Sequence, residues 1–233
     1  MSDSFLPAME MKNVSKSFHF PSGEQYLVFD SINLTLRSGE IVALTGPSGS
    51  GKSTLLHIAG LLDTPSMGSI VLMGEDISTM NDRRKTLFRS KCIGFVYQFH
   101  FLINEMSALD NVMLPSLISG NSYSEAHDYA MLLLDKMKLF SKVNNMPSQL
   151  SGGEKQRVAV CRALVNKPKI ILADEPTGSL DHETAEIVIH EIMSMARDVG
   201  LSAIIATHNR KHALNMDYSL ELCNGRISEH NGI

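Results

Sequence analysis

The 233-residue sequence lacks any apolar run that approaches the ~20 residues a helix needs to cross a bilayer. Its first residues show no basic-then-apolar pattern, so we expect no signal peptide and expect any membrane role to go through a partner. The net charge of −4 leaves no basic excess. Because nucleic-acid binding usually needs a basic face, we expect no nucleic-acid partner.

Cysteine is scarce, and Cys92, Cys161 and Cys223 are odd in number, far apart and without a Cys-x-x-Cys or Cys/His cluster. This pattern predicts reduced, buried thiols in a cytosolic compartment. The chain also lacks repeats and low-complexity tracts. With 43% hydrophobic residues it has enough apolar material for a core, and its length allows one large domain or two small ones.

The order of the apolar runs predicts an α/β fold. The first 40 residues alternate between apolar and polar, which predicts antiparallel strands with turns at residues 21–23 and 38–39. Short, uniformly apolar runs then alternate with helices: EIVAL, CIGFVY, KIILAD and LSAIIAT. Such strands are typical of a largely parallel sheet covered on both faces. A terminal hairpin is predicted to turn at Asn224-Gly225.

From about residue 99 to residue 165 the pattern becomes helical, and we expect this segment to be a helical subdomain inserted into the α/β core. Helical spacing is shown by Ala126, Ala130, Leu133, Leu134 and Met137. A later helix is predicted to stop at Gly200, with an apolar stripe of Val188, Ile192, Met195, Ala196 and Val199. We predict one domain with subdomains across residues 1–233.

Residues 46–53, GPSGSGKS, match the pattern G-x-x-x-x-G-K-[ST] between a predicted strand and a predicted helix. Glycines let such a loop curl so that successive N–H groups face the phosphates of a nucleotide. The helix that begins near Lys52 adds the positive end of its dipole. We predict that Lys52 places its cation on the β- and γ-phosphates and that Ser53 offers its hydroxyl to Mg²⁺.

Asp174 and Glu175 end the apolar run IILADE, and the carboxyl ends of parallel strands border the ligand crevice in such sheets. Asp174 is suited to hold Mg²⁺, directly or through water, and Glu175 to polarise the attacking water. Alone, the pair could be two solvated acids, but the phosphate loop favours the functional interpretation. Asp181, in the turn that follows, is by itself a helix N-cap.

Three isolated residues are weaker candidates. His208 ends another apolar run and could contact the γ-phosphate and position the water, although a structural role is the commoner one for a lone histidine. Gln98 also follows a buried strand, and its amide could bridge metal, water and a neighbouring subdomain. Phe18 could stack on adenine, whereas an aromatic residue in a half-buried strand is ordinarily core.

The stretch LSGGEKQR, residues 150–157, begins a helix with two adjacent glycines, each costing about 1 kcal/mol relative to alanine. Ser151 and Glu154 match a capping box. We interpret the glycines as room for a large anion to approach the backbone. Since the one phosphate loop serves the chain's own nucleotide, that anion would be the γ-phosphate held by a second copy, in an isologous dimer that encloses two ATP molecules.

In this order, GPSGSGKS, Gln98, LSGGEKQR, ILADE, SLD and His208 resemble the nucleotide-binding ATPases of ABC transporters over essentially the whole chain. The resemblance implies a P-loop NTPase core with a mainly parallel sheet, an N-terminal antiparallel β subdomain and an inserted α-helical subdomain. It implies ATP hydrolysis, with ATP and Mg²⁺ as cofactors. It also implies a homodimer of ATPase subunits and integral membrane permease subunits as partners.

The resemblance also implies roles by position. Phe18 would stack on adenine, and the phosphates would be held by Gly46, Pro47, Ser48, Gly49, Ser50, Gly51, Lys52, Ser53 and Thr54. Ser53, Gln98 and Asp174 would serve the metal, with Gln98 also sensing water, and Glu175 would be the catalytic base. The partner's nucleotide would be contacted by Ser151, Gly152, Gly153 and Gln156. Asp181 and His208 would communicate across the dimer.

Within that family, FVYQFHFL and ALDNVMLP resemble the lipoprotein-releasing ATPases, which serve permeases that extract lipoproteins from the bacterial inner membrane. This implies a place on the cytoplasmic face of that membrane. Phe101, Asn104 and Asn209 stand where that group usually has His, Pro and Asp, and a permease helix is expected to dock near the first two. An ATP-dependent regulatory clamp of the cell-division type and a macrolide or peptide export ATPase remain alternatives, whereas the signature stretch and Glu175 disfavour a plain P-loop kinase.

Overall fold

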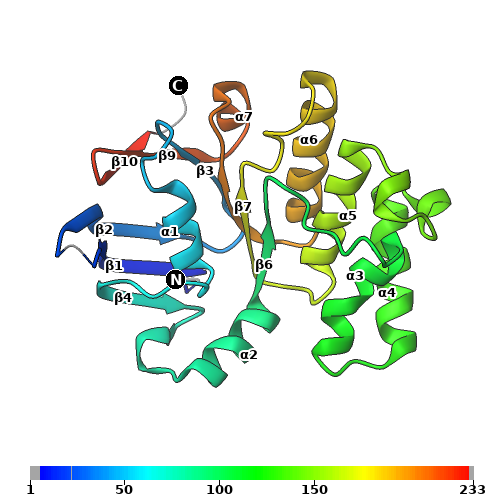
Figure 1. Cartoon of the computed structure of the whole chain (residues 1–233), viewed down its shortest axis with the longest axis horizontal. Helices are drawn as coiled ribbons and strands as arrows, with labels where there is room; N and C mark the ends of the chain where they lie inside the picture. Colours follow the sequence, from blue (N-terminus) through cyan, green and yellow to red (C-terminus); the bar gives the residue numbers. More distant parts are fainter. Residues whose placement is uncertain (1–5, 22, 231–233) are drawn as a thin grey trace, which may run out of the picture.

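In the computed structural model, which describes residues 6–21 and 23–230, two β-sheets are covered by helices (Figure 1). The strands are β1 (Met9–His19), β2 (Gln25–Leu36), β3 (Ile41–Thr45), β4 (Met67–Leu72), β5 (Glu75–Asp76), β6 (Ile93–Val96), β7 (Ile170–Asp174), β8 (Ser202–Ala206), β9 (Tyr218–Cys223) and β10 (Arg226–His230). The α-helices are α1 (Lys52–Ala59), α2 (Asp82–Cys92), α3 (Ala108–Ile118), α4 (Tyr123–Lys136), α5 (Gly152–Leu164), α6 (His182–Asp198) and α7 (Arg210–Leu214). Short 3₁₀ helices are η1 (Ile77–Thr79), η2 (Phe140–Lys142) and η3 (Pro147–Gln149).

The N-terminal sheet is antiparallel, in the order β2-β1-β4-β5, and forms the blue and teal part of Figure 1. The antiparallel strands predicted for the first 40 residues are therefore confirmed. At the first predicted turn, Gly23 N–H donates to Phe20 O at 2.9 Å, while Ser22 lies outside the described residues. The second turn lies at Ser38-Gly39 as predicted, where Glu40 N–H donates to Arg37 O at 3.3 Å.

The larger sheet has the order β10-β9-β3-β8-β7-β6, and its strands run parallel except β10, which pairs antiparallel with β9. Successive side chains of a strand point to opposite faces, and here both faces are buried. In β3, for example, Ile41 and Ala43 join one core cluster and Val42 and Leu44 join the other. This double burial explains the uniformly apolar strands and confirms the predicted mainly parallel sheet.

The two clusters correspond to two covering layers. One face of the parallel sheet packs with α1 and the antiparallel sheet, through residues that include Leu55, Leu56 and Phe29. The other face packs with α3, α4, α5 and α6, through residues that include Val112, Val160 and Ile192. The helices α3, α4 and α5 fall within the predicted helical segment 99–165 and lie to the right in Figure 1.

The predicted helical stripes are largely confirmed. Ala126, Ala130, Leu133, Leu134 and Met137 are all buried. In α6 the predicted residues are buried except Val199, which is 52% exposed. That part of the prediction is wrong because the helix ends at Asp198 and Val199 already has φ −109° and ψ 6° before the stop at Gly200.

The C-terminal hairpin turns at Asn224-Gly225 as predicted, with φ of 50° and 71°, the left-handed values that a two-residue hairpin turn requires.

The prediction that all three cysteine thiols are buried is only partly confirmed. Cys161 is buried in the core, and burial raises the pKa of its thiol, but Cys92 and Cys223 are half-buried. The expectation of three buried thiols is therefore wrong for two of them.

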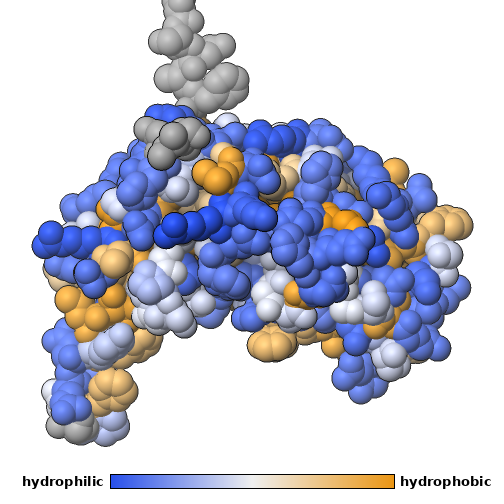
Figure 2. Space-filling view, turned by 90° about the horizontal axis from the view of Figure 1, so that it is seen from above, coloured by the Kyte–Doolittle hydropathy of each residue, from blue (hydrophilic) through white to orange (hydrophobic). Residues whose placement is uncertain are grey.

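The surface seen in Figure 2 is largely hydrophilic, with separate apolar patches of limited extent. The hairpin formed by β1 and β2 contributes exposed apolar side chains at its outer end, among them Phe18, Phe20, Tyr26 and Leu27. Within residues 6–21 and 23–230, no helix combines the length with the apolar character that a membrane span requires.

Candidate functional site

The phosphate loop, residues 46–51, connects β3 to α1 and takes a shape that side chains would obstruct. Gly46 has φ 141°, and a Cβ there would lie 2.2 Å from Leu222 O. Gly51 has φ 101°, and a Cβ there would meet Val28 Cγ1 at 2.7 Å. Gly51 is also the N-cap of α1 and supplies no side-chain hydrogen bond. The first N–H groups of α1 therefore have no side-chain cap, which suits an anion.

Lys52 is buried beside this loop, with 8% of its surface exposed. Its Nζ donates to Gly46 O at 2.9 Å and to Pro47 O at 3.1 Å, so the ammonium lies over the loop. Ser53 and Thr54 follow in the first turn of α1. The sequence thus delivers a cation and two hydroxyls to the same helix terminus that carries the positive dipole end.

A cavity of about 520 Å³ opens beside the loop and collects most of the predicted residues. We call it the phosphate-loop cavity, and it is lined by Phe18, Tyr26, Val28, Gly46, Ser48, Gly49, Gly51, Lys52, Ser53, Thr54, Gln98, Asp174, Glu175 and His208. Pro47 and Ser50 belong to the loop but line neighbouring hollows instead.

Three of these side chains come from the carboxyl ends of adjacent parallel strands. Asp174 is the last residue of β7, His208 follows β8 by two residues, and Gln98 follows β6 by two residues. Because β6, β7 and β8 are neighbours in one parallel sheet, their ends meet at the same edge as the phosphate loop after β3. This topology explains why residues far apart in sequence line one cavity.

The Asp174 carboxylate has the chemistry of a cation ligand. Its Oδ1 atom is buried and has no hydrogen-bond partner among the described residues. A buried carboxylate oxygen without a partner is costly, and a divalent cation beside the Ser53 hydroxyl would satisfy it. Within the described part of the chain no cluster of three His, Cys, Asp or Glu residues could hold a metal alone. These residues therefore fit Mg²⁺ that is also held by phosphate oxygens.

Glu175 adopts a left-handed backbone conformation, with φ 49°, which is uncommon for a residue with a side chain. Its N–H donates to Ala206 O at 3.1 Å, so the residue after β7 is bonded to the last residue of β8. Its Oε2 lies 2.5 Å from Nδ1 of His208. The carboxylate is thus held by the histidine that follows β8, an arrangement that would suit the predicted general base.

Gln98 is held by the turn that follows β7. The Ser179 hydroxyl donates to Gln98 O at 3.3 Å, and a Cβ at Gly178 would lie 2.9 Å from Gln98 Nε2. Gly178 therefore makes room for the Gln98 amide, which reaches the cavity beside Asp174 and Glu175.

The far end of the cavity is aromatic and apolar. Phe18 of β1 is 43% exposed, and Tyr26 lies opposite it across the β1–β2 ladder. Sequence reasoning found Phe18 but missed Tyr26 and Val28. Their place depends on register shifts within β1, between Val14 and Ser17, which leave no readable pattern in the sequence.

Ser151, Gly152 and Gly153, which we call the signature tip, do not line this cavity. Ser151 is the N-cap of α5, and the predicted capping box with Glu154 is present: Ser151 N–H donates to Glu154 Oε2 at 2.7 Å and Glu154 N–H to Ser151 Oγ at 3.2 Å. Asp181 is likewise the N-cap of α6, accepting from Thr184 N–H at 3.0 Å. One chain therefore does not bring the signature tip to its own phosphate loop.

The signature tip instead packs against the start of α6. A Cβ at Gly153 would lie 2.3 Å from Thr184 Cγ2, and one at Gly152 would lie 3.2 Å from Leu180 Cδ2. Close packing within the chain thus explains Gly153 without any anion. Gly153 is buried, whereas Ser151 and Gly152 are exposed. The contact of both glycines with a phosphate stays a prediction, and packing is a second reason for Gly153.

Gln156 is fully buried, which does not support its predicted contact with a partner's nucleotide. Its Oε1 lies 2.7 Å from His100 Nδ1, and its Nε2 donates to Tyr97 O at 3.1 Å. One turn and a half further along α5, Arg162 donates to the carbonyls of His100 and Phe101 at 2.7 and 2.6 Å. Both side chains of α5 therefore hold residues 97–101, which we call the aromatic loop.

The aromatic loop presents apolar rings at the surface. Phe99 and Phe101 are 62% and 65% exposed, and the Phe101 ring meets Tyr97 edge-on at 5.4 Å between centroids. Phe101 also has φ 45°, a left-handed value that turns the chain at this point. Exposed aromatic groups of this kind mark surfaces that contact another molecule.

This fold, with a P-loop beside carboxylates at the ends of parallel strands, defines an ATPase cassette. Comparison with known proteins agrees: residues 29–178 match the family model described as ABC transporter. The chain belongs to the ABC transporter family.

Curated relatives match over nearly their whole length. The chain is 48% identical to the lipoprotein-releasing system ATP-binding protein LolD of Zymomonas mobilis subsp. mobilis, over 97% of each chain. It is 45% identical to the protein of the same name from Roseobacter denitrificans, over 96% of this chain and 98% of that one.

Solved structures match the fold equally well. A dimeric structure of the ATP-binding cassette MJ0796 in a post-hydrolysis state, bound to ADP and Pi, has a TM-score of 0.88 at 35% identity, covering 97% of this chain and 99% of that one. A second dimeric structure, described as a bacterial ABC transporter cassette, has the same TM-score at 36% identity and the same coverage. The predicted fold class and ABC-type identity are confirmed.

Proposed function

We propose that this chain, as a single ABC-type domain, hydrolyses ATP to power a membrane permease that releases lipoproteins from the bacterial inner membrane. It would act at the cytoplasmic face, attached through the permease. The observation that carries the proposal is 48% identity over 97% of both chains to a lipoprotein-releasing ATP-binding protein. The residues gathered in the phosphate-loop cavity support the same activity.

The proposed chemistry assigns one role to each side of the cavity. The phosphate loop and Lys52 bind the triphosphate. Lys52 Nζ, which donates to the carbonyls of Gly46 and Pro47 in this structure, would donate to the phosphates instead. Ser53, Asp174 and Gln98 would hold Mg²⁺, which when bound neutralises charge on the phosphates. Glu175, oriented by His208, accepts a proton from the attacking water. Phe18 stacks on the adenine ring.

We also propose that two copies assemble head to tail, so that Ser151, Gly152 and Gly153 of one chain complete the ATP site of the other. The exposed N-cap of α5 and the remoteness of the signature tip from its own phosphate loop support this arrangement. Asp181, at the start of α6, would lie at the same interface and signal across it with His208.

Mixed dimers test this arrangement. We expect Lys52→Ala and Ser151→Arg chains each to lose ATP hydrolysis alone, because each damages both sites of its homodimer. Mixed together, they form a heterodimer with one intact site and recover part of the activity, since that site takes Lys52 from one chain and Ser151 from the other. Full activity of a monomeric form would contradict the dimer.

The aromatic loop is the proposed contact for the permease. Its exposed Phe99 and Phe101 offer an apolar surface to a permease helix, and their loop leads directly from Gln98 in the cavity. Phe101 and Asn104 depart from the usual residues of lipoprotein-releasing ATPases at this place, so we expect the permease of this chain to carry matching changes.

The function is tested by reconstituting the chain with its co-purifying membrane partner in vesicles that hold a labelled lipoprotein. We expect ATP-dependent release of the lipoprotein, and none with the Lys52→Ala chain. ATP-dependent binding to the partner without release would instead indicate a regulatory clamp. ATP hydrolysis stimulated by a macrolide or peptide, with no lipoprotein released, would indicate an export ATPase.

A further inference from the structure

A buried lysine lies behind the aromatic end of the phosphate-loop cavity. Lys16 belongs to β1, two residues before Phe18, and only 8% of its surface is exposed. Its Nζ lies 4.9 Å from the centroid of the Phe18 ring, within the range of a cation–π interaction. Phe18 lines the cavity and Lys16 does not. The ring therefore lies next to both the buried ammonium and the cavity.

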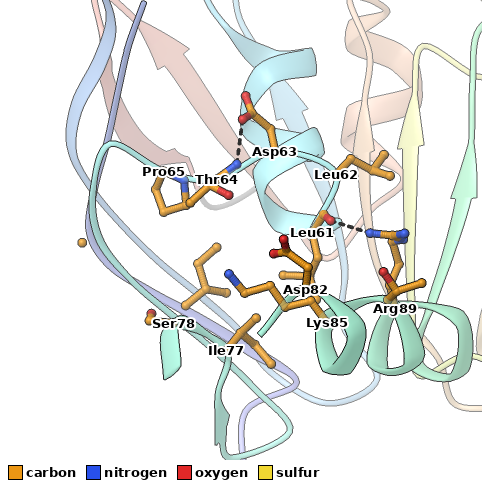
Figure 3. Close-up of a pocket in the computed structure, with 13 residues that line it drawn as sticks. Leu61, Leu62, Asp63, Thr64, Pro65, Ile77, Ser78, Asp82, Lys85 and Arg89 are labelled. Carbon is orange, nitrogen blue, oxygen red and sulfur yellow. Dashed lines mark hydrogen bonds between the residues drawn. The ribbon is translucent and has the colours of Figure 1, made fainter. Parts of the chain in front are cut away.

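The ammonium is fixed by two acceptors from a single loop. Lys16 Nζ donates to Asp63 Oδ1 at 2.8 Å and to Thr64 O at 2.9 Å. Asp63 Oδ1 also accepts from Thr64 N–H at 2.7 Å, the bond drawn at the top of Figure 3. A buried ammonium needs such partners to offset its lost hydration. Because both acceptors belong to neighbouring residues of one loop, that loop determines the position of the ammonium group.

The loop, residues 61–65, follows the helix that begins at the phosphate loop. At its first residue, Leu61 O accepts from Arg89 Nη1 of α2 at 2.7 Å, the second bond in Figure 3. Helix α1 has eight residues and so spans about 12 Å between Lys52 and this loop. The phosphate site and the anchor of Lys16 thus lie at the two ends of one short, rigid element.

We propose that Lys16 is a positioning residue for the nucleotide base. It holds the Phe18 ring at a fixed place relative to the phosphate loop, so that a purine stacks on the ring while its triphosphate occupies the loop. A ring that is 43% exposed would otherwise lose side-chain freedom on binding, and ordering it beforehand removes that cost. The cation also draws electron density from the ring, which favours stacking by an electron-rich purine. This inference depends on the proposed binding of ATP.

Equilibrium binding of ATP and of inorganic tripolyphosphate, measured by calorimetry on the full chain, separates base from phosphate contacts. For Lys16→Met we expect the Kd of ATP to rise about fivefold and the Kd of tripolyphosphate, which has no base, to stay the same. Lys16→Arg keeps a cation and is expected to recover most of the affinity. Lys12→Met, on the same strand but exposed and paired with Glu10 at 3.2 Å, is the control with no expected change.

A double-mutant cycle tests whether Lys16 acts through the ring. Phe18→Ala is expected to weaken ATP binding about tenfold, and Lys16→Met added to it is expected to weaken it no further. An additional fivefold loss in the double variant, or an equal loss for tripolyphosphate, would overturn the inference. An unchanged Kd of ATP in Phe18→Ala would overturn it as well.

Two further measurements keep the test decisive. The folding of Lys16→Met is judged by thermal unfolding, and if it does not fold, Asp63→Ala removes one of the two acceptors of Lys16 Nζ. We expect Asp63→Ala to raise the Kd of ATP about twofold without affecting the Kd of tripolyphosphate. Equal effects on both ligands would overturn the inference. Hydrolysis is assayed separately. A chain that binds ATP in the predicted way but does not hydrolyse it would contradict the proposed function and leave the positioning role supported.

Discussion

The phosphate-loop cavity and the signature tip are both built at helix N-termini, yet within one chain only the first gathers predicted site residues from several strands. At the cavity, β3, β6, β7 and β8 bring Lys52, Gln98, Asp174 and His208 to one edge of a sheet. At the signature tip, Gly152 and Gly153 lie close to Leu180 and Thr184, and no residue of the tip lines the phosphate-loop cavity. Packing within the chain therefore accounts for part of this motif, and the proposed contact with a second chain's nucleotide concerns the same helix start.

The largest expected effect lies in the cavity. Glu175→Gln keeps the shape of the side chain but removes the base, so we expect hydrolysis to fall at least about 100-fold while ATP still binds. Phosphate release measures the turnover, and size-exclusion chromatography with ATP should show a stabilised dimer. Glu183→Gln, an exposed acid in the first turn of α6, is the control with ordinary turnover. Unchanged hydrolysis in Glu175→Gln would contradict the assignment of the base.

The next effect separates packing from ligand binding at the signature tip. We expect Gly153→Ala to lose about 1–3 kcal/mol of unfolding free energy, because its Cβ meets Thr184 Cγ2 at 2.3 Å. Gly152→Ala should cost less, since its neighbour at 3.2 Å is the end of the Leu180 side chain. Urea unfolding measures both, and Thr184→Ser, which removes Cγ2, should rescue the first. A Gly153→Ala chain with normal stability but no ATP-dependent dimer would instead show that Gly153 serves the predicted phosphate contact and not packing.

Gln156, further along α5, allows the same distinction between an internal structural role and a contact with a partner's nucleotide. Since its amide is buried and bonded to His100 and Tyr97 O, we expect Gln156→Ala to lose about 1–2 kcal/mol of unfolding free energy. The Kd of ATP for the isolated chain should not change. If thermal unfolding is unaltered while ATP-dependent dimerisation is lost, the predicted contact with a partner's nucleotide gains support over the internal role.

The smallest expected effect is the pH dependence of the capping box. The Ser151 N–H bond is the main cause that holds the pKa of Glu154 below its ordinary value of 4.5. A carboxyl with a lowered pKa stabilises the fold above the unfolded value, and this stabilisation is lost as pH falls through the lower, folded value. We expect Glu154→Gln to be less stable by about 0.5 kcal/mol near neutral pH, with the gap closing as pH falls through the lowered, folded pKa of Glu154. A gap in Tm that is constant across the acid range would contradict this.

The residues of the phosphate-loop cavity could be predicted from the sequence because each lies within or directly after a short, recognisable segment. The phosphate loop is one contiguous motif, and Asp174, Glu175, Gln98 and His208 each follow a uniformly apolar strand, which places them at one sheet edge. The fold class followed from the same strands. Each of these inferences needs only the residues on either side of the motif.

What the sequence did not predict depends on contacts between distant segments. Helix α2 was missed because none of its residues is buried, so it has no apolar stripe. The internal role of Gly153 depends on Thr184, which lies 31 positions away, and that of Lys16 on Asp63 and Thr64. Neither spacing nor composition carries information about such pairs.

The bonds from Gln156 and Arg162 to the aromatic loop have a mechanical consequence. Helix α5 has 13 residues and so is a rod of about 20 Å, with Ser151 at one end and the loop attached along its side. We therefore expect a displacement of Phe99 or Phe101 to move Ser151 by tilting this rod rather than by bending it locally. In the proposed dimer, a permease that presses on the aromatic loop would thereby shift the ATP site of the opposite subunit.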